Sequence, residues 1–240
     1  MQDGVMKKIS DLYSEKVLHK DDQWEPKKVN PDLMDCPAQA DGYATVIQTG
    51  KPKFEWSEAT LNFKRPNKNN LIIYEAWVYD HSVERTIEGM TNRMYYYEDL
   101  GINAIELMPV QEFDGNLNWG YSPNHYFAFD KAYGTPEQFK TFVDECHKRG
   151  IAVILDMVFN HATGQFPYAK MWWDSSKNCT AADNPFFNVS APHNFSVYHD
   201  FKHLYSETKE YFNQVLKYWL EEYNVDGFRF DLTKGFVQNP

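Results

Sequence analysis

An arginine and an aspartate stand two residues apart in the segment Gly-Phe-Arg-Phe-Asp at 227–231 of this 240-residue chain. Phe228 and Phe230 alternate there with Arg229 and Asp231, the period-two pattern of a strand with two different faces. The arginine and the aspartate therefore share a face, where the guanidinium can hold the carboxylate ionised by charge and hydrogen bonds. Such a carboxylate can act as a nucleophile. A structural ion pair at a strand end explains the same pattern, so this motif alone leaves both interpretations open.

A second group of polar residues lies within and after an apolar run at 151–161. The run is typical of a strand buried on both faces of a parallel sheet, and it contains Asp156, Asn160 and His161. Parallel α/β proteins place their chemistry at the carboxyl ends of the strands. We therefore expect Asp156 and His161 to cluster with the arginine and the aspartate of the first motif at one end of a sheet.

The elements that must position these residues are alternating strands and helices from residue 71 onward. Apolar runs predict strands and helical spacing predicts helices in this order: strand 71–79, helix 87–100, strand 103–110, helix 136–149, the strand beginning at 151, helix 211–223 and a strand that ends at 231. A long loop runs from the second strand to Thr135, and a loop of about forty residues follows the third strand. Loops this long are usually functional.

This alternation implies βαβ units and a parallel sheet. A doubly wound sheet also fits, but the residues after the first strand, Tyr-Asp-His-Ser at 79–82, form no glycine-rich phosphate loop. A β/α barrel is therefore preferred. An eight-stranded barrel needs roughly 200 to 250 residues, and residues 71–240 supply only four strands. We predict an α/β chain that forms the first half of a (β/α)8 TIM barrel.

Residues 1–70 differ from the rest in composition, because Pro, Lys, Asn and Asp are common and helical periodicity is absent. A strand is expected at 42–50 between two glycines, and two shorter alternations follow at 54–56 and 61–63. Too few strands fit here for a complete β-sandwich. We predict two domains: 1–70 as the tail of a small β-rich accessory domain plus a linker, and 71–240 as the first four βα units of the barrel.

Four motifs, in this order along the chain, resemble the α-amylase superfamily, glycoside hydrolase family 13. They lie at 119–135, 156–161, 200–203 and 227–234. The residues of these motifs are most similar to those of debranching, branching and trehalohydrolase members. The resemblance covers residues 71–240, and four ordered motifs are far more specific than one. It implies a catalytic barrel preceded by an N-terminal β-sandwich domain, with this chain as the N-terminal part of the catalytic domain.

The resemblance also implies catalytic roles. Asp231 matches the nucleophile that forms a covalent glycosyl–enzyme intermediate, Arg229 keeps it ionised, and Asp156 braces Arg229. A retaining mechanism needs a second, protonated carboxyl about 5 Å away. In this family it is a glutamate on the fifth strand, which we expect beyond Pro240. Glu106 lies on a barrel strand as well, and we interpret it as structural.

Three further residues match positions that contact the sugar. By the resemblance, His161 hydrogen-bonds the sugar next to the nucleophile, Tyr121 stacks on that same sugar, and Lys234 lines the leaving-group side. Asn160 belongs with Asp156 to the structural support of the site.

We expect no cofactor and no tightly bound calcium. Calcium-dependent members commonly have a histidine directly after the lysine of the nucleophile motif, and its backbone oxygen binds the ion, whereas Gly235 stands at that place here. Glycine also has a backbone oxygen, and Asn160 and Asp200 can supply others. The motifs similar to debranching enzymes nevertheless argue against a metal.

The expected function is glycoside hydrolysis of α-glucans of the starch or glycogen type by a retaining double displacement, of the α-amylase or debranching type. A glucan branching or transglycosylating enzyme uses the same nucleophile, and a non-catalytic carbohydrate-binding protein uses the same scaffold. The Arg229–Asp231 pair argues against a pure binder, which needs no nucleophile. The 240-residue chain alone is expected to be inactive without the general acid and to pair with other copies through its open sheet edges.

Composition limits the partners further. The net charge of −10 disfavours nucleic acid and anionic membranes, whereas a neutral polysaccharide is indifferent to it. Aromatic residues make up 17% of the chain; they can stack on sugars, but most of them are expected to fill the core. No apolar run reaches the length of a membrane span. The compartment is left open by the sequence.

Overall fold

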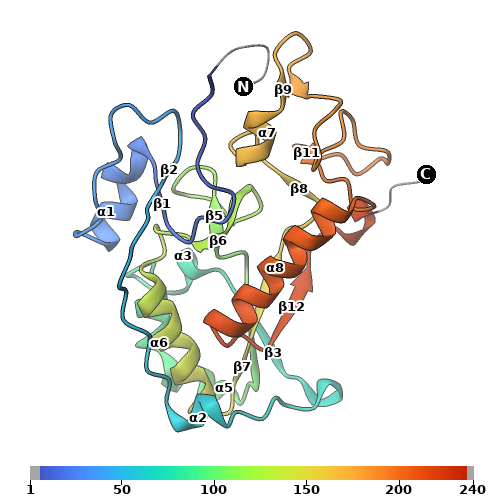
Figure 1. The fold of residues 1–240 in the computed structure, drawn as a ribbon. Helices are drawn as coiled ribbons and strands as arrows, with labels where there is room; N and C mark the ends of the chain where they lie inside the picture. Colours follow the sequence, from blue (N-terminus) through green and yellow to red (C-terminus); the bar gives the residue numbers. More distant parts are fainter. Residues whose placement is uncertain (1–5, 237–240) are drawn as a thin grey trace.

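A four-stranded parallel sheet organises the computed structural model, which describes residues 6–236 (Figure 1). Its strands are β3 (Ile73–Ala76), β4 (Ala104–Leu107), β7 (Ala152–Met157) and β12 (Gly227–Phe230), in the spatial order β12-β7-β4-β3. Each new strand along the chain adds to the same side of the sheet. This order lacks the reversal that defines a doubly wound sheet. The predicted α/β class with a parallel sheet is confirmed.

Helices connect successive strands of the sheet. They are α4 (Ile87–Thr91) and α5 (Met94–Leu100), then α6 (Pro136–His147), then α8 (Ser206–Glu222). Local sequence explains the start of α6, because Thr135 and Gln138 form a reciprocal capping box and Pro136 occupies the first turn. On α8 one face is buried, and from it Trp219 donates a 2.8 Å hydrogen bond to the Tyr126 carbonyl. No helix among residues 6–236 is long and apolar enough to cross a membrane.

Two of the expected elements were wrong in detail. The single helix expected at 87–100 is interrupted at Asn92 and Arg93, where the backbone of Arg93 leaves the helical region. The first strand is shorter than expected, because residues Val78–His81 form the short helix α3. At Arg93 the apolar spacing continues across the break, because Met90 before it and Met94 after it are both buried.

The loop expected after the second strand instead contains an antiparallel hairpin, β5 (Gln111–Phe113) and β6 (Pro123–Phe129). Every residue of β6 is buried. Its Tyr126 ring has Phe159, Phe166, Phe201, Tyr211 and Phe212 as edge-on neighbours. The high aromatic content therefore largely builds the core, as expected.

The loop after β7 is held together by short strands. It contains β8 (His161–Ala162), α7 (Pro167–Met171), β9 (Trp173–Asp174), β10 (Cys179–Thr180) and β11 (His199–Asp200). In it, β8 pairs with β11 so that His161 stands opposite Asp200. The end of this loop is thereby fixed beside the carboxyl end of β7.

The N-terminal segment, residues 6–70, runs along the outside of α6 from α1 to α2 (Figure 1). Its elements are β1 (Val17–Leu18), η1 (Lys20–Gln23), α1 (Glu25–Val29), β2 (Ala44–Thr45), α2 (Glu58–Leu61) and η2 (Lys68–Asn70). The strand expected at 42–50 is two residues long, and the alternation at 61–63 follows a helical turn. The segment is anchored through Ser10, whose hydroxyl lies 2.7 Å from His125 Nε2, and through Asp22, which pairs with the buried Lys131.

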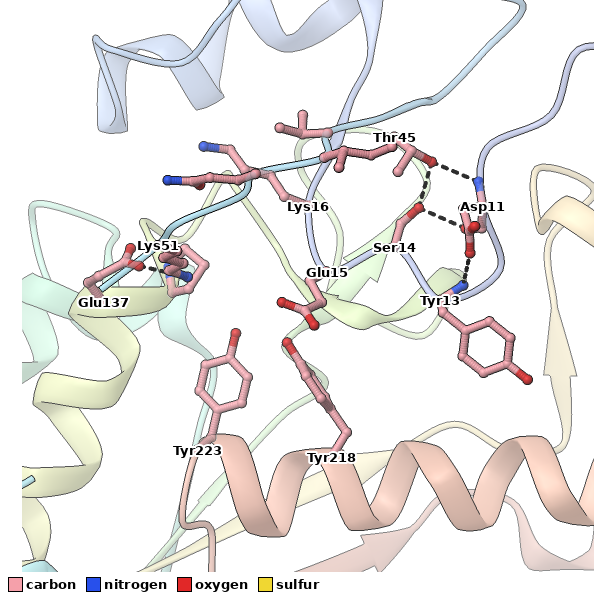
Figure 2. A pocket seen from close by; sticks show the side chains of 14 residues that line it. Asp11, Tyr13, Ser14, Glu15, Lys16, Thr45, Lys51, Glu137, Tyr218 and Tyr223 are labelled. Carbon is pink, nitrogen blue, oxygen red and sulfur yellow. Dashed lines mark hydrogen bonds and ion pairs between the residues drawn. The ribbon is translucent and has the colours of Figure 1, made fainter. Parts of the chain in front are cut away.

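A pocket of about 330 Å³ lies between this segment and helices α6 and α8 (Figure 2). Lys51 and Glu137 form a 2.8 Å ion pair at one side. The hydroxyl of Tyr223, which directly follows α8, points toward this pair, and the hydroxyl of Tyr218 on α8 points toward Glu15. None of the residues that line it is a site residue predicted from the sequence. The pocket marks an imperfectly filled junction between the segment and the helices.

Asp144 of α6 is the acceptor that fixes the segment at α2. It accepts hydrogen bonds from the backbone N–H and hydroxyl of Ser57, at 3.0 and 2.8 Å, and from the hydroxyl of Thr60 at 2.6 Å. Burial disfavours its charge, but hydrogen bonds from Thr60, Lys148 and Ser57 outweigh burial and lower the pKa of Asp144 to about 2. The charged carboxylate therefore contributes to holding the segment in place.

Replacing Asp144 by alanine is expected to lower the free energy of unfolding by about 1–3 kcal/mol at pH 7, since Ser57 and Thr60 lose their acceptor. The native pKa lies below the unfolded value of about 3.9, so this contribution is complete above that pH and fades as pH falls toward 2. Denaturant unfolding should show a smaller difference between wild type and variant at pH 3 than at pH 7. The exposed Asp99→Ala serves as control, and an unchanged difference at pH 3 would refute the role of the charge.

Candidate active site

One guanidinium nitrogen joins the carboxylates of two neighbouring strands. Arg229 Nη1 lies 3.0 and 2.8 Å from the two carboxylate oxygens of Asp156 and 2.8 Å from Oδ1 of Asp231. Arg229 and Asp156 are direct register partners on β12 and β7. Because the strands are parallel, all three side chains meet at the carboxyl end of the sheet. The predicted contact of these three residues is confirmed.

Asp156 is the buried member of this group, with a side chain only 1% exposed. Burial raises its pKa, and hydrogen bonds from Arg229 and from the Tyr121 hydroxyl, 2.8 Å away, act in the opposite direction. The Asp231 side chain is 23% exposed, so this carboxylate remains accessible while Arg229 orients it. The geometry therefore separates a buried bracing carboxylate from a reachable one.

Tyr121 reaches Asp156 because the chain turns sharply before it. Gly120 has φ +94°, and a Cβ there would lie 2.3 Å from the carbonyl oxygen of Pro109. Only glycine fits this turn. Burial, followed by the neighbouring Asp156, raises the pKa of the Tyr121 hydroxyl, which therefore stays protonated and donates its hydrogen bond.

His161 is linked to this group through the backbone of Tyr121. Its Nε2 lies 2.9 Å from the Tyr121 carbonyl oxygen, and its Nδ1 lies 2.7 Å from Nδ2 of Asn160. A carbonyl only accepts and an amide N–H₂ only donates, so the proton of the ring is on Nε2. Burial lowers the pKa of His161, which fits a neutral ring. His161 and Asn160 thus lie beside Tyr121 at the carboxyl end of β7, and their roles in the site stay predictions.

Lys234 is the least connected of the predicted residues. It lies in η3 (Thr233–Phe236), at the end of the nucleophile motif, and its Nζ stands 5.4 Å from the centre of the Phe195 ring. The turn that leads to it contains Leu232 with φ +40°, a conformation that costs free energy in a residue with a side chain. Backbone strain of this kind is concentrated at functional sites, and it directly follows Asp231.

Glu106 lies on β4 at the level of Glu75 on β3. Burial, and then the charges of Asp156 and Glu75, raise its pKa. The structural interpretation of Glu106 stays a prediction.

Two of the three residues named as possible calcium ligands, Asp200 and Gly235, accept hydrogen bonds from side chains in the described part of the chain. His193 Nε2 lies 3.0 Å from Asp200 Oδ1 and 2.9 Å from the Gly235 carbonyl oxygen, and Asn188 donates to Asp200 Oδ2 at 2.7 Å. Calcium takes six to eight oxygen ligands. Within residues 6–236 no group of three or more His, Cys, Asp or Glu side chains could hold a metal. Asn160 Oδ1 is buried without a hydrogen-bond partner in this structure, and the absence of tightly bound calcium stays a prediction.

Sequence reasoning missed three residues beside the site. They are His193, which contacts Asp200 and Gly235, and the pair Tyr198 and Ser122, whose hydroxyls lie 3.1 Å apart. The Tyr198 ring lies 5.5 Å from that of His161. Only the crowding of polar and aromatic residues in a long loop pointed toward them, because their partners are distant in sequence.

Comparison with known proteins agrees with this geometry. The family described as "Alpha amylase, catalytic domain" matches residues 60–202. The chain belongs to the α-amylase family. The match begins about ten residues before the predicted domain boundary at 71, so it includes the last part of the N-terminal segment.

Individual proteins are similar in sequence to this chain as well. The malto-oligosyltrehalose trehalohydrolase of Saccharolobus solfataricus is 31% identical over 204 residues, which are 85% of this chain and 34% of that protein. The chloroplastic isoamylase 1 of Oryza sativa subsp. japonica is 34% identical over 231 residues, covering 82% of this chain and 27% of that protein. The chain thus spans about a third of the length of such relatives.

A solved structure extends the likeness to three dimensions. The pullulanase of Anoxybacillus sp. LM18-11 complexed with maltotetraose matches with a TM-score of 0.66 and 25% identity. The match covers 95% of this chain and 34% of the pullulanase. Nearly the whole chain, including much of the N-terminal segment, therefore has a counterpart in that enzyme.

Proposed function

We propose that this chain carries the nucleophile of a retaining glycosidase that acts on α-glucans. The main support is the shared Arg229 Nη1, which holds the accessible Asp231 and the buried Asp156 at 2.8 Å each. The guanidinium complements the negative charge of Asp231 and fixes its direction. A carboxylate that is oriented in this way and still exposed is suited to attack an anomeric carbon.

The proposed reaction has two steps. In the first, an oxygen of Asp231 bonds to the anomeric carbon while the bond to the glycosidic oxygen breaks, and that oxygen takes a proton from a carboxylic acid. In the second, water attacks the same carbon, gives its proton to the carboxylate formed, and releases Asp231. The resemblance assigns the acid to a glutamate on a fifth strand, and none of the described residues is assigned to it.

An α-glucan substrate is supported by the residues around the nucleophile. Tyr121 offers a ring face beside Asp156, His161 offers a neutral imidazole bonded to the Tyr121 carbonyl, and Lys234 lies three residues after Asp231 in η3. The similar pullulanase was solved with maltotetraose, and the similar trehalohydrolase and isoamylase are named for related carbohydrates. We infer the α-amylase or debranching type of hydrolysis, with branching or transglycosylation as the alternative that shares the nucleophile.

We also infer that the sheet is the first half of a (β/α)8 barrel. Its strand order follows the chain, and in the described residues β3 and β12 each have one edge without a partner strand. Ile72 and Ile73 at one edge and Phe230 at the other are exposed. Four further strands would cover them. The assignment of residues 1–70 to an N-terminal accessory domain and its linker stays part of this proposal.

The test uses the full-length protein with a soluble linear α-1,4-glucan and with a branched one, followed by NMR of the anomeric protons. Retention predicts that the α-anomer of each new reducing end appears first and mutarotates later. A β-anomer appearing first would overturn the retaining mechanism. New α-1,6 branches without new reducing ends would favour branching over hydrolysis, and binding without any bond cleavage would favour the non-catalytic alternative.

A further inference from the structure

Residues 194–198 form an exposed stretch of the loop before β11, and their neighbour His193 is buried. Phe195, Val197 and Tyr198 are between 37% and 57% exposed, whereas the side chain of His193 is 5% exposed. A buried polar side chain at the base of an exposed loop needs hydrogen-bond partners. The partners of His193 show what the loop is attached to.

Three contacts fix both ring nitrogens of His193. The backbone N–H of Phe195 donates to Nδ1 at 3.1 Å, so Nδ1 bears no proton. Nε2 lies 3.0 Å from Asp200 Oδ1 and 2.9 Å from the Gly235 carbonyl oxygen, both of which are acceptors. Nε2 therefore carries the proton and donates to both oxygens. The ring is a neutral bridge between two segments of the chain.

Both segments belong to the candidate site. Asp200 stands opposite His161 in the β8–β11 pair. Gly235 lies four residues after Asp231, and its backbone is packed so tightly against Asn160 that a Cβ would come within 2.8 Å of the Asn160 Cβ. His193 thus joins the loop to the backbone that follows the nucleophile and to the strand that holds His161.

The exposed part of this loop presents two rings to the site. Tyr198, with φ +44°, has its ring 5.5 Å from the His161 ring, and its hydroxyl lies 3.1 Å from the Ser122 hydroxyl. Phe195 lies 5.4 Å from Lys234 Nζ. The two rings therefore flank the residues proposed to contact the sugar, Phe195 on the side of Lys234 and Tyr198 on the side of His161.

We infer that His193 is a positioning residue that locks residues 194–198 in place, so that Tyr198 and Phe195 form a stacking wall for the glucose rings of a bound α-glucan. Aromatic rings are suited to the apolar faces of sugars, and a wall fixed before binding avoids the entropy cost of ordering the loop. The inference rests on the proposed function for its ligand. A loop that is held only by exposed side chains would lose this conformational entropy each time a ligand binds.

The test measures binding of a maltooligosaccharide of about seven glucose units by calorimetry, in a full-length protein whose Asp231 is replaced by asparagine to prevent turnover. Adding His193→Ala should weaken binding about tenfold, and His193→Gln, whose side-chain amide can donate to both oxygens, should restore most of it. Tyr198→Ala should weaken binding to a similar degree. The effects of Tyr198→Ala and His193→Ala should add only in part, because His193 acts partly through the Tyr198 ring.

Tyr95, an exposed tyrosine on α5, provides the matched control, and Tyr95→Ala should leave binding unchanged. Unchanged binding in a folded His193→Ala variant, equal losses in the alanine and glutamine variants, or fully additive losses with Tyr198→Ala would each overturn the inference. If His193→Ala does not fold, the binding affinities of His193→Gln and Tyr198→Ala still test the inference. Because binding is measured without turnover, an inactive wild type would refute the proposed hydrolysis and leave this test intact.

Discussion

An Asp231→Asn variant of the full-length protein is expected to lose turnover of soluble α-glucans by roughly 10⁴-fold or more, the size of effect seen when a covalent nucleophile is removed. Asparagine has the same shape and can still accept the hydrogen bond from Arg229, but its amide does not form the glycosyl ester. Binding should persist, since Tyr121 and His161 are untouched. Initial rates of reducing-end release and calorimetric binding measure the two effects separately.

Asp183→Asn is the matched control, because this exposed aspartate lies in the loop after β7 and has no assigned role. Its rates should equal those of the wild type. Turnover of Asp231→Asn within about tenfold of the wild type would mean that another carboxyl attacks the sugar. Glu106 would then be the first candidate, and the roles assigned to Asp231 and Arg229 would be abandoned.

Replacing Arg229 by methionine is expected to remove both activity and stability. Asp156 would keep only the Tyr121 hydroxyl as a side-chain partner for a carboxylate that is 1% exposed. Breaking a buried ion pair costs about 3–5 kcal/mol, and since Arg229 itself is 44% exposed we expect about 2–3 kcal/mol. Adding Asp156→Asn should recover part of this loss, because a neutral amide needs no counter-ion.

The loss of stability caused by Arg229→Met should also depend on pH. Burial already raises the pKa of Asp156, and loss of Arg229 raises it further. A carboxyl whose native pKa exceeds the unfolded value destabilises the protein at high pH, and this penalty fades as pH falls through the native pKa. Denaturant unfolding should therefore show the largest deficit of Arg229→Met at neutral pH and a smaller one near pH 4.

Arg65→Met is the control for this experiment. Arg65 contacts Asp226 at 3.2 Å but is 63% exposed, and Asp226 keeps a 2.9 Å contact to His147. Its removal should cost less than about 1 kcal/mol, as for other exposed pairs. Equal losses for the two arginine variants, or a deficit of Arg229→Met that does not change with pH, would contradict the bracing role of Asp156.

The sequence could predict that Arg229, Asp231 and Asp156 lie together because these signals are local, whereas the bracing role of Asp156 came from the family resemblance. Alternation places Arg229 and Asp231 on one face, and the rule that parallel strands end together places Asp156 beside them. The hairpin was missed because the apolar run from Tyr126 to Phe129 does not alternate, and a strand buried on both faces gives no periodic signal. The break at Arg93 was missed because the apolar spacing continues across it.

His193 illustrates what local patterns cannot contain. Its partner Gly235 is 42 residues away, and the contact exists only because β8 and β11 bring the loop back to the end of the sheet. Nothing in the residues around position 193 distinguishes a bridging histidine from an exposed one. Local sequence also gives no sign of the contacts of Asp144, because its partners Ser57 and Thr60 come from a segment with no helical periodicity.

The hydrogen bonds of Tyr126 bear on how the exposed loops of this site can change in evolution. Its hydroxyl lies 2.8 Å from the carbonyl oxygens of Val158 and His161, and its own carbonyl accepts from Trp219 on the outer helix. The strand end that holds Asp156 is thus fixed from behind by buried groups. If the proposed function is right, mutations at exposed positions such as Phe195 and Tyr198 would alter which sugar chains are bound without disturbing this frame. Evolution can therefore explore new specificities in the loops at little cost to folding.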